Sequence, residues 1–180
     1  EYQVLVYDQR GHGRSFQPVA GTRSGSGSGH GDGSGYGPED YASDLEKILD
    51  ELKWSEVTLV GHSMGGRVAF HFASMHPERV TRLVIEDIGP RMDPVSAGLV
   101  LRLLEMVPVP FPNRKAAKEY FDTEFLTAFE DRRQAENLAA YLYANLTENE
   151  RKEAVWRFSE PGIRESVAQG RASERWDEIA

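Results

Sequence analysis

The chain has 180 residues, 39% of them hydrophobic, which suits one packed domain or part of a larger one. Its 21 Lys and Arg are outnumbered by 29 Asp and Glu, and the resulting net charge of -8 makes nucleic acids and anionic membrane surfaces poor candidate partners. It contains no cysteine, which excludes disulfides, thiolate metal sites and a thiol nucleophile.

The first half of the chain predicts strands and helices in alternation. Short apolar runs rich in β-branched and aromatic residues are typical of strands in a parallel sheet, and they occur at residues 2–8, 57–60 and 83–85. A helix is expected to begin at Pro38, where acidic residues follow a proline, and a second over residues 64–76. This order of elements is typical of an α/β protein with a parallel sheet.

A low-complexity stretch separates the first predicted strand from the first predicted helix. Within the loop 19–37, glycine occupies every second position from Gly25 to Gly37. This composition predicts a flexible, linker-like insertion. A phosphate-binding loop is disfavoured because the glycines lack the G-x-G-x-x-G and G-x-x-x-x-G-K spacings, and a single Asp32 is too little for a calcium-binding glycine repeat.

The pattern changes after Gly89, where prolines punctuate segments of helical composition. Helices and no strand are expected there, at residues 99–107, 114–121, 133–146 and 148–158. A helical layer that follows the third predicted strand indicates a lid, with a bundle that has no gating role as the alternative. The predicted organisation is a core over residues 1–89, a lid over 90–172 and a return towards the core over 173–180.

One short motif combines a nucleophile with the turn that would expose it. Gly61 to Gly65 (GHSMG) matches G-x-S-x-G and lies between a predicted strand and a predicted helix. We expect any side chain at Gly61 or Gly65 to collide with the neighbouring strand or helix. Ser63 would then present its hydroxyl at a helix N-terminus, where the amide of Met64 could stabilise an oxyanion. A purely structural turn is the alternative.

Three motifs together resemble the α/β-hydrolase fold family over nearly the whole chain. Residues 8–15 (DQRGHGRS) are similar to its D-x-R-G-x-G-x-S turn, residues 61–66 (GHSMGG) to its nucleophile elbow, and residues 86–90 (EDIGP) to the turn before an inserted lid. The branch indicated is that of small intracellular bacterial serine esterases. Residues 8–11 also resemble proline iminopeptidases, although Met64 departs from the tryptophan common in that branch.

The resemblance implies a partial α/β-hydrolase fold, with a parallel sheet flanked by helices, and assigns roles to residues. Ser63 would be the nucleophile, the Met64 amide an oxyanion donor, and Gly61, His62 and Gly65 the rest of the elbow. Asp87 is one candidate for the acid, while the commoner pattern places the acid on a later strand, beyond residues 176–180 (WDEIA).

The catalytic base expected in this family follows the nucleophile in the chain, as does the acid. The five histidines are His12, His30, His62, His71 and His76. None follows residue 76, so we expect that the base, the acid of the commoner pattern and a second oxyanion donor lie outside an internal piece of a longer hydrolase.

The resulting hypothesis is a cytoplasmic serine hydrolase that acts on small carboxylic esters through an acyl-enzyme on Ser63. The alternatives are a catalytically inactive or binding-only module and a proline iminopeptidase-like peptidase. We expect no cofactor, no metal, and no nucleic acid or membrane as partner, since no histidine spacing typical of a metal site and no long apolar run occurs. A sheet that ends at residues 2–8 would leave an exposed edge, which predicts self-association.

Overall fold

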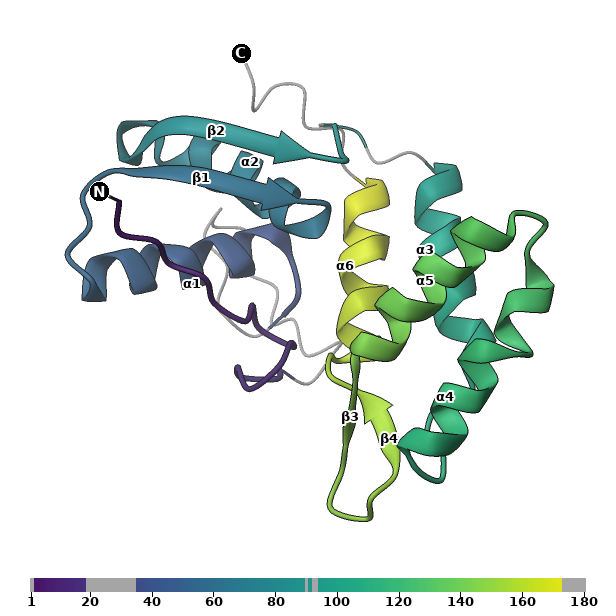
Figure 1. The fold of residues 1–180 in the computed structure, drawn as a ribbon. Coiled ribbons are helices and arrows are strands. Elements are labelled where there is room, and N and C mark those ends of the chain that lie inside the picture. Colours follow the sequence, from purple (N-terminus) through teal and green to yellow (C-terminus); the bar gives the residue numbers. More distant parts are fainter. Residues whose placement is uncertain (1, 19–34, 90, 92–93, 173–180) are drawn as a thin grey trace. The chain divides into compact units, whose positions relative to one another are not determined.

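The computed structural model describes residues 2–18, 35–89, 91 and 94–172, and divides the chain into two units. One unit comprises Glu1–Gly98 with Pro161–Ala180, and the other comprises Leu99–Glu160. The first contains a parallel sheet, and the second is mostly helical (Figure 1).

The sheet of the first unit consists of two parallel strands. Strand β1 (Val57–His62) pairs with β2 (Val80–Glu86), and a helix α2 (Met64–Met75) and a short 3₁₀ helix η1 (Pro77–Arg79) connect them. One face of the sheet packs on α2 and on α1 (Pro38–Glu51). The core between them consists of buried Ala42, Leu45, Leu49 and Phe72, against which the partly buried Val57, Leu59 and Val80 pack. This strand, helix, strand order confirms the expected α/β class.

The predicted strand at residues 2–8 was wrong, because no strand pairing is found there. Burial nevertheless alternates as in extended chain: Leu5 and Tyr7 are half-buried, whereas Val4 and Val6 are exposed. Tyr7 packs against the core between α1, α2 and β1. The apolar pattern thus marks a segment with one packed face, and a strand additionally needs a backbone partner.

The end of the glycine-rich loop belongs to the core, which corrects the linker interpretation there. Tyr36 is 1% exposed, and its hydroxyl donates a hydrogen bond to the carbonyl oxygen of Pro18 at 2.8 Å. Its ring lies where a Cβ on Gly162 of helix α6 (Glu160–Ala172) would be. The flexible stretch proposed for residues 19–34 lies outside the described residues.

The second unit holds an aromatic core between short helices. Its helices are the part of α3 (Pro94–Met106) beyond Gly98, α4 (Arg114–Asp122), η2 (Phe125–Ala128) and α5 (Arg132–Ala144). Phe121 and Phe125 lie in its centre, with ring centroids 5.2 Å apart. The helices expected at 99–107, 114–121 and 133–146 are thereby confirmed to within a few residues.

The helix expected at residues 148–158 was wrong, because the chain forms a hairpin there. Strands β3 (Leu146–Glu148) and β4 (Ala154–Trp156) pair antiparallel. The side-chain oxygen of Asn149 accepts hydrogen bonds from the amides of Arg151 and Glu153, at 2.9 and 3.0 Å. Such side-chain bonds favour a turn over a helix, even in a segment rich in helix-forming charged residues.

No helix in the described part of the chain has both the length and the apolarity required to span a membrane.

Candidate functional site

Ser63 lies at the sharp turn between β1 and α2, as the motif predicts. Its backbone φ is 50° and ψ is -117°, a region that non-glycine residues rarely adopt. The turn is held by the Ser63 amide, which donates to the carbonyl oxygen of Glu86 in β2 at 3.0 Å. A strained residue that its surroundings hold in place is typical of a functional site.

Gly61 is required by close approach, whereas Gly65 is not. A Cβ on Gly61 would lie 2.5 Å from the carbonyl oxygen of Gly65 and 2.7 Å from the Cα of Gly66. A Cβ on Gly65 would meet only Gln9, with Nε2 at 3.8 Å, which is ordinary van der Waals contact. The expected collision is therefore confirmed at Gly61 and wrong at Gly65.

The N-terminal end of α2 offers the amide expected of an oxyanion donor. The first bond of the helix runs from the Arg67 amide to the Ser63 carbonyl oxygen at 3.2 Å. The amide of Met64 comes before it and has no acceptor within the helix. An unbonded amide at the positive end of a helix favours negative charge next to Ser63.

His62 and Asp87 lie beside the serine, at the carboxyl ends of β1 and β2. The imidazole Nε2 of His62 is 3.7 Å from Oδ2 of Asp87, and both side chains are mostly exposed. Asp87 also has a positive φ of 68°. The predicted acid thus faces the histidine that precedes the nucleophile, and its role as the catalytic acid stays a prediction.

Within the described part of the chain, the Ser63 hydroxyl has no hydrogen-bond partner. The ring of His12 lies at the turn of residues 8–15, where Nδ1 is 3.0 Å from the carbonyl oxygen of Arg10. His76 directly follows α2, and its ring is tilted against that of Phe72, with ring centroids 4.8 Å apart. His30 lies outside the described residues.

Residues 8–15 form the turn that the D-x-R-G-x-G-x-S pattern predicts. The Ser15 hydroxyl donates to the carbonyl oxygen of Asp8 at 2.6 Å, and the Asp8 carboxylate accepts from the Arg14 amide at 3.3 Å. Gly13 has a φ of 54°, and a Cβ there would overlap the Asp8 carboxylate. The pattern therefore encodes the backbone shape of the turn.

Arg10 fastens this turn to α1. Its Nε and Nη2 donate to the two carboxylate oxygens of Asp44, both at 2.7 Å, and Nη1 donates to the carbonyl oxygen of Gly35 at 2.8 Å. Burial lowers the pKa of the guanidinium, but the hydrogen bond and charge of Asp44, with the charge of Asp40, raise it overall. Arg10 is thus a permanently charged, bidentate anchor.

Sequence reasoning did not single out Tyr7, which packs on the core of α1 and α2, or Gln9, which lies near the elbow. Burial raises the pKa of the Tyr7 hydroxyl to about 12, helped by the charge of Asp44 and opposed by a hydrogen bond from Gln9. The Gln9 side chain lies against Gly65. The signal that could have found them is their position where the apolar run at residues 2–8 meets the glycine-containing turn at residues 10–15.

In the ranges that the structure describes, no three His, Cys, Asp or Glu side chains are grouped so that they could hold a metal ion.

Comparisons with known proteins agree with this geometry. A model of the alpha/beta hydrolase fold matches residues 1–164. A Bacillus subtilis (strain 168) relative that carries the name 2-succinyl-6-hydroxy-2,4-cyclohexadiene-1-carboxylate synthase is 39% identical over 88 residues, 49% of this chain and 28% of its own. An sn-1-specific diacylglycerol lipase of Danio rerio is 28% identical over 161 residues, 87% of this chain and 44% of its own.

A solved structure of a marine microorganism esterase superposes with a TM-score of 0.63 at 25% identity, and the match covers 91% of this chain and 56% of that one. The chain thus spans about half the length, or less, of the three proteins compared.

Proposed function

The chain belongs to the α/β-hydrolase fold family, and from this premise we propose that Ser63 is the nucleophile of a serine hydrolase acting on carboxylic esters. The observation that carries the proposal is the strained backbone of Ser63, which holds a hydroxyl between the end of a parallel strand and the start of a helix. The Danio rerio lipase and the marine esterase support ester chemistry by their names.

In the proposed reaction, the Ser63 oxygen attacks the acyl carbon while its proton passes to a base. The Met64 amide hydrogen-bonds the oxyanion of the tetrahedral intermediate. The intermediate collapses, the C–O bond to the alcohol breaks, and the alcohol leaves with a proton from the base. Water then attacks the acyl-enzyme and releases the acid.

The activity is proposed for the whole protein, since the chain spans only part of its relatives. We propose that polypeptide other than the described residues brings the base to Ser63. The unit Leu99–Glu160 is proposed to act as a lid over the substrate. We propose the cytoplasm as its location, since the cysteine-free chain needs no oxidising compartment to form disulfides.

A second candidate is a binding module without catalysis, favoured by the Ser63 hydroxyl that has no partner among the described residues. Hydrolysis of an activated short-chain p-nitrophenyl ester by the whole protein separates the two. The proposal expects Ser63→Ala to lower kcat by at least about 1,000-fold, as loss of a nucleophile does. Ser55→Ala, at an exposed serine just before β1, is the matched control and should leave kcat unchanged.

Equal turnover by the Ser63→Ala variant would reject the proposed nucleophile. No turnover by the whole protein of either the ester or a proline-containing peptide anilide would favour the binding module. Turnover of the anilide in preference to the ester would instead favour a peptidase.

A further inference from the structure

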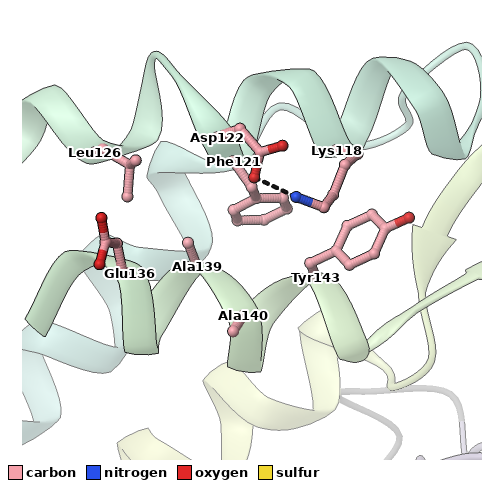
Figure 2. Close-up of a pocket in the computed structure, with 8 residues that line it drawn as sticks. All are labelled: Lys118, Phe121, Asp122, Leu126, Glu136, Ala139, Ala140 and Tyr143. Carbon is pink, nitrogen blue, oxygen red and sulfur yellow. Dashed lines mark hydrogen bonds and ion pairs between the residues drawn. The ribbon is translucent and has the colours of Figure 1, made fainter. Parts of the chain in front are cut away.

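A groove in the second unit has the chemistry of a ligand site separate from Ser63. It lies between α4 and α5, has a volume of about 270 Å³, and is drawn in Figure 2. Its walls are Lys118, Phe121, Asp122, Leu126, Glu136, Ala139, Ala140 and Tyr143. The volume falls just below the roughly 300 Å³ at which small-molecule pockets begin, so an occupant must be small.

The floor of the groove is apolar and well packed. Phe121, Leu126 and Ala139 are each less than a tenth exposed. Two successive alanines on α5, Ala139 and Ala140, leave the space between the helices open (Figure 2). A floor of one aromatic ring and aliphatic groups favours an unbranched alkyl chain over a polar ligand.

One end of the groove, at Tyr143, is positively charged. The guanidinium of Arg114 lies 4.5 Å from the centroid of the Tyr143 ring, and the ammonium of Lys118 lies 5.9 Å from it. Lys118 also pairs with Asp122, one turn further along α4. Arg114 donates to the carbonyl oxygen of Leu146 and, among the described residues, pairs with no carboxylate.

The start of α4 adds to this positive charge. Arg114 is its first residue, and its first turn contains no acidic residue. The amides at a helix N-terminus carry partial positive charge, which Arg114 reinforces. At the other end of the groove, Glu136 is already paired with Arg132 at 2.8 Å. The charge therefore favours an anionic group at the Tyr143 end.

From the apolar floor and this charged end, we propose that the groove binds an unbranched alkyl carboxylate of about eight carbons. The alkyl chain lies on Phe121 between α4 and α5, and the carboxylate meets Lys118 beside Tyr143, where the nearby charge of Arg114 also favours it. The volume, just below that of an ordinary small-molecule pocket, limits the occupant to a short chain. The site goes beyond the proposed esterase activity and does not depend on it.

Titration calorimetry with octanoate tests the site on the 180-residue chain. Lys118→Gln should weaken octanoate binding about tenfold by removing a charge-assisted hydrogen bond. Asp122→Asn should strengthen it several-fold, because Lys118 is then released from its ion pair. Lys115→Gln, an exposed cation on the same helix that does not line the groove, is the control and should leave the affinity unchanged.

A second set of measurements tests the apolar part. Ala140→Phe, at an exposed position on the rim, should abolish octanoate binding by filling the groove. Octylamine, with the same tail and the opposite charge, should bind at least tenfold more weakly than octanoate. Equal binding of octylamine, equal weakening by Lys115→Gln, or unchanged binding to the Ala140→Phe variant would each overturn the proposal.

Discussion

A Cβ on Gly61 would lie 2.5 Å from the carbonyl oxygen of Gly65, a separation that real Cβ atoms do not reach. The end of β1 and the first turn of α2 are thus in close backbone contact on either side of Ser63. Ser63, with a φ of 50°, is the single residue between the end of the strand and the start of the helix.

Gly61→Ala should therefore lower the free energy of unfolding by about 2–4 kcal/mol, the range of substitutions that force backbone to move. Gly65→Ala is the matched variant, because its Cβ meets only ordinary contacts and alanine favours a helix. It should change stability by less than about 1 kcal/mol. Urea unfolding of both variants checks the difference, and equal losses would show that the two backbones are not in contact.

Arg10→Lys should destabilise the chain by about 3 kcal/mol, although it keeps the charge. A lysine cannot form both hydrogen bonds to Asp44 and also reach the Gly35 carbonyl oxygen, so the half-buried Asp44 carboxylate and the buried Gly35 carbonyl lose partners. Arg132→Lys, in the exposed pair with Glu136, should cost less than about 1 kcal/mol. A similar cost for both in denaturant titrations would contradict the anchoring role of Arg10.

Stability should fall at alkaline pH through Tyr7. Burial raises the pKa of its hydroxyl from 10.0 to about 12, so the folded chain keeps a proton that the unfolded chain releases. The contribution of the Tyr7 hydroxyl to the free energy of unfolding is complete below pH 10 and is lost as the pH rises from 10 to 12. Tyr7→Phe should make the melting temperature fall less steeply over this range, although the buried Tyr41, whose pKa is also raised, still contributes to the fall. Tyr2→Phe, at a side chain 93% exposed, serves as the control. Parallel curves for Tyr7→Phe and the unaltered chain would contradict this assignment.

We propose that the 180-residue chain associates with itself through the uncovered face of the sheet. Val60 in β1 and Val84 in β2 are register partners that are 73% and 50% exposed, and Val4 and Val6 add further exposed apolar surface. Sedimentation velocity should show the mean mass rising with concentration. Val60→Lys with Val84→Glu should suppress the rise, and a monomer at every concentration in the unaltered chain would refute the association.

The sequence predicted elements well where one local signal decided them. Proline and acidic residues mark the start of α1, and the G-x-S-x-G pattern marks the turn at Ser63. It failed where the outcome depends on distant partners. The apolar run at residues 2–8 has the composition of a strand but pairs with no other strand. Tyr36 lies in a glycine-rich segment, yet contacts with Pro18 and Gly162 bury it.

The candidate site was only partly predictable for the same reason. The position of Ser63 follows from its neighbours in sequence, but that of Asp87 opposite His62 requires the register of β1 and β2.

The hairpin that begins at Leu146 was not predicted either. It depends on side-chain hydrogen bonds of Asn149, which composition does not reveal.

Labelling with a fluorophosphonate probe, followed by peptide mass spectrometry, tests the nucleophile most directly. The probe forms a covalent bond only with an activated serine, so the adduct identifies the residue. In the whole protein, the modified peptide should contain Ser63, and Ser63→Ala should remove the label while Ser55→Ala retains it. A label on another serine, or a label that survives the Ser63→Ala change, would contradict the account.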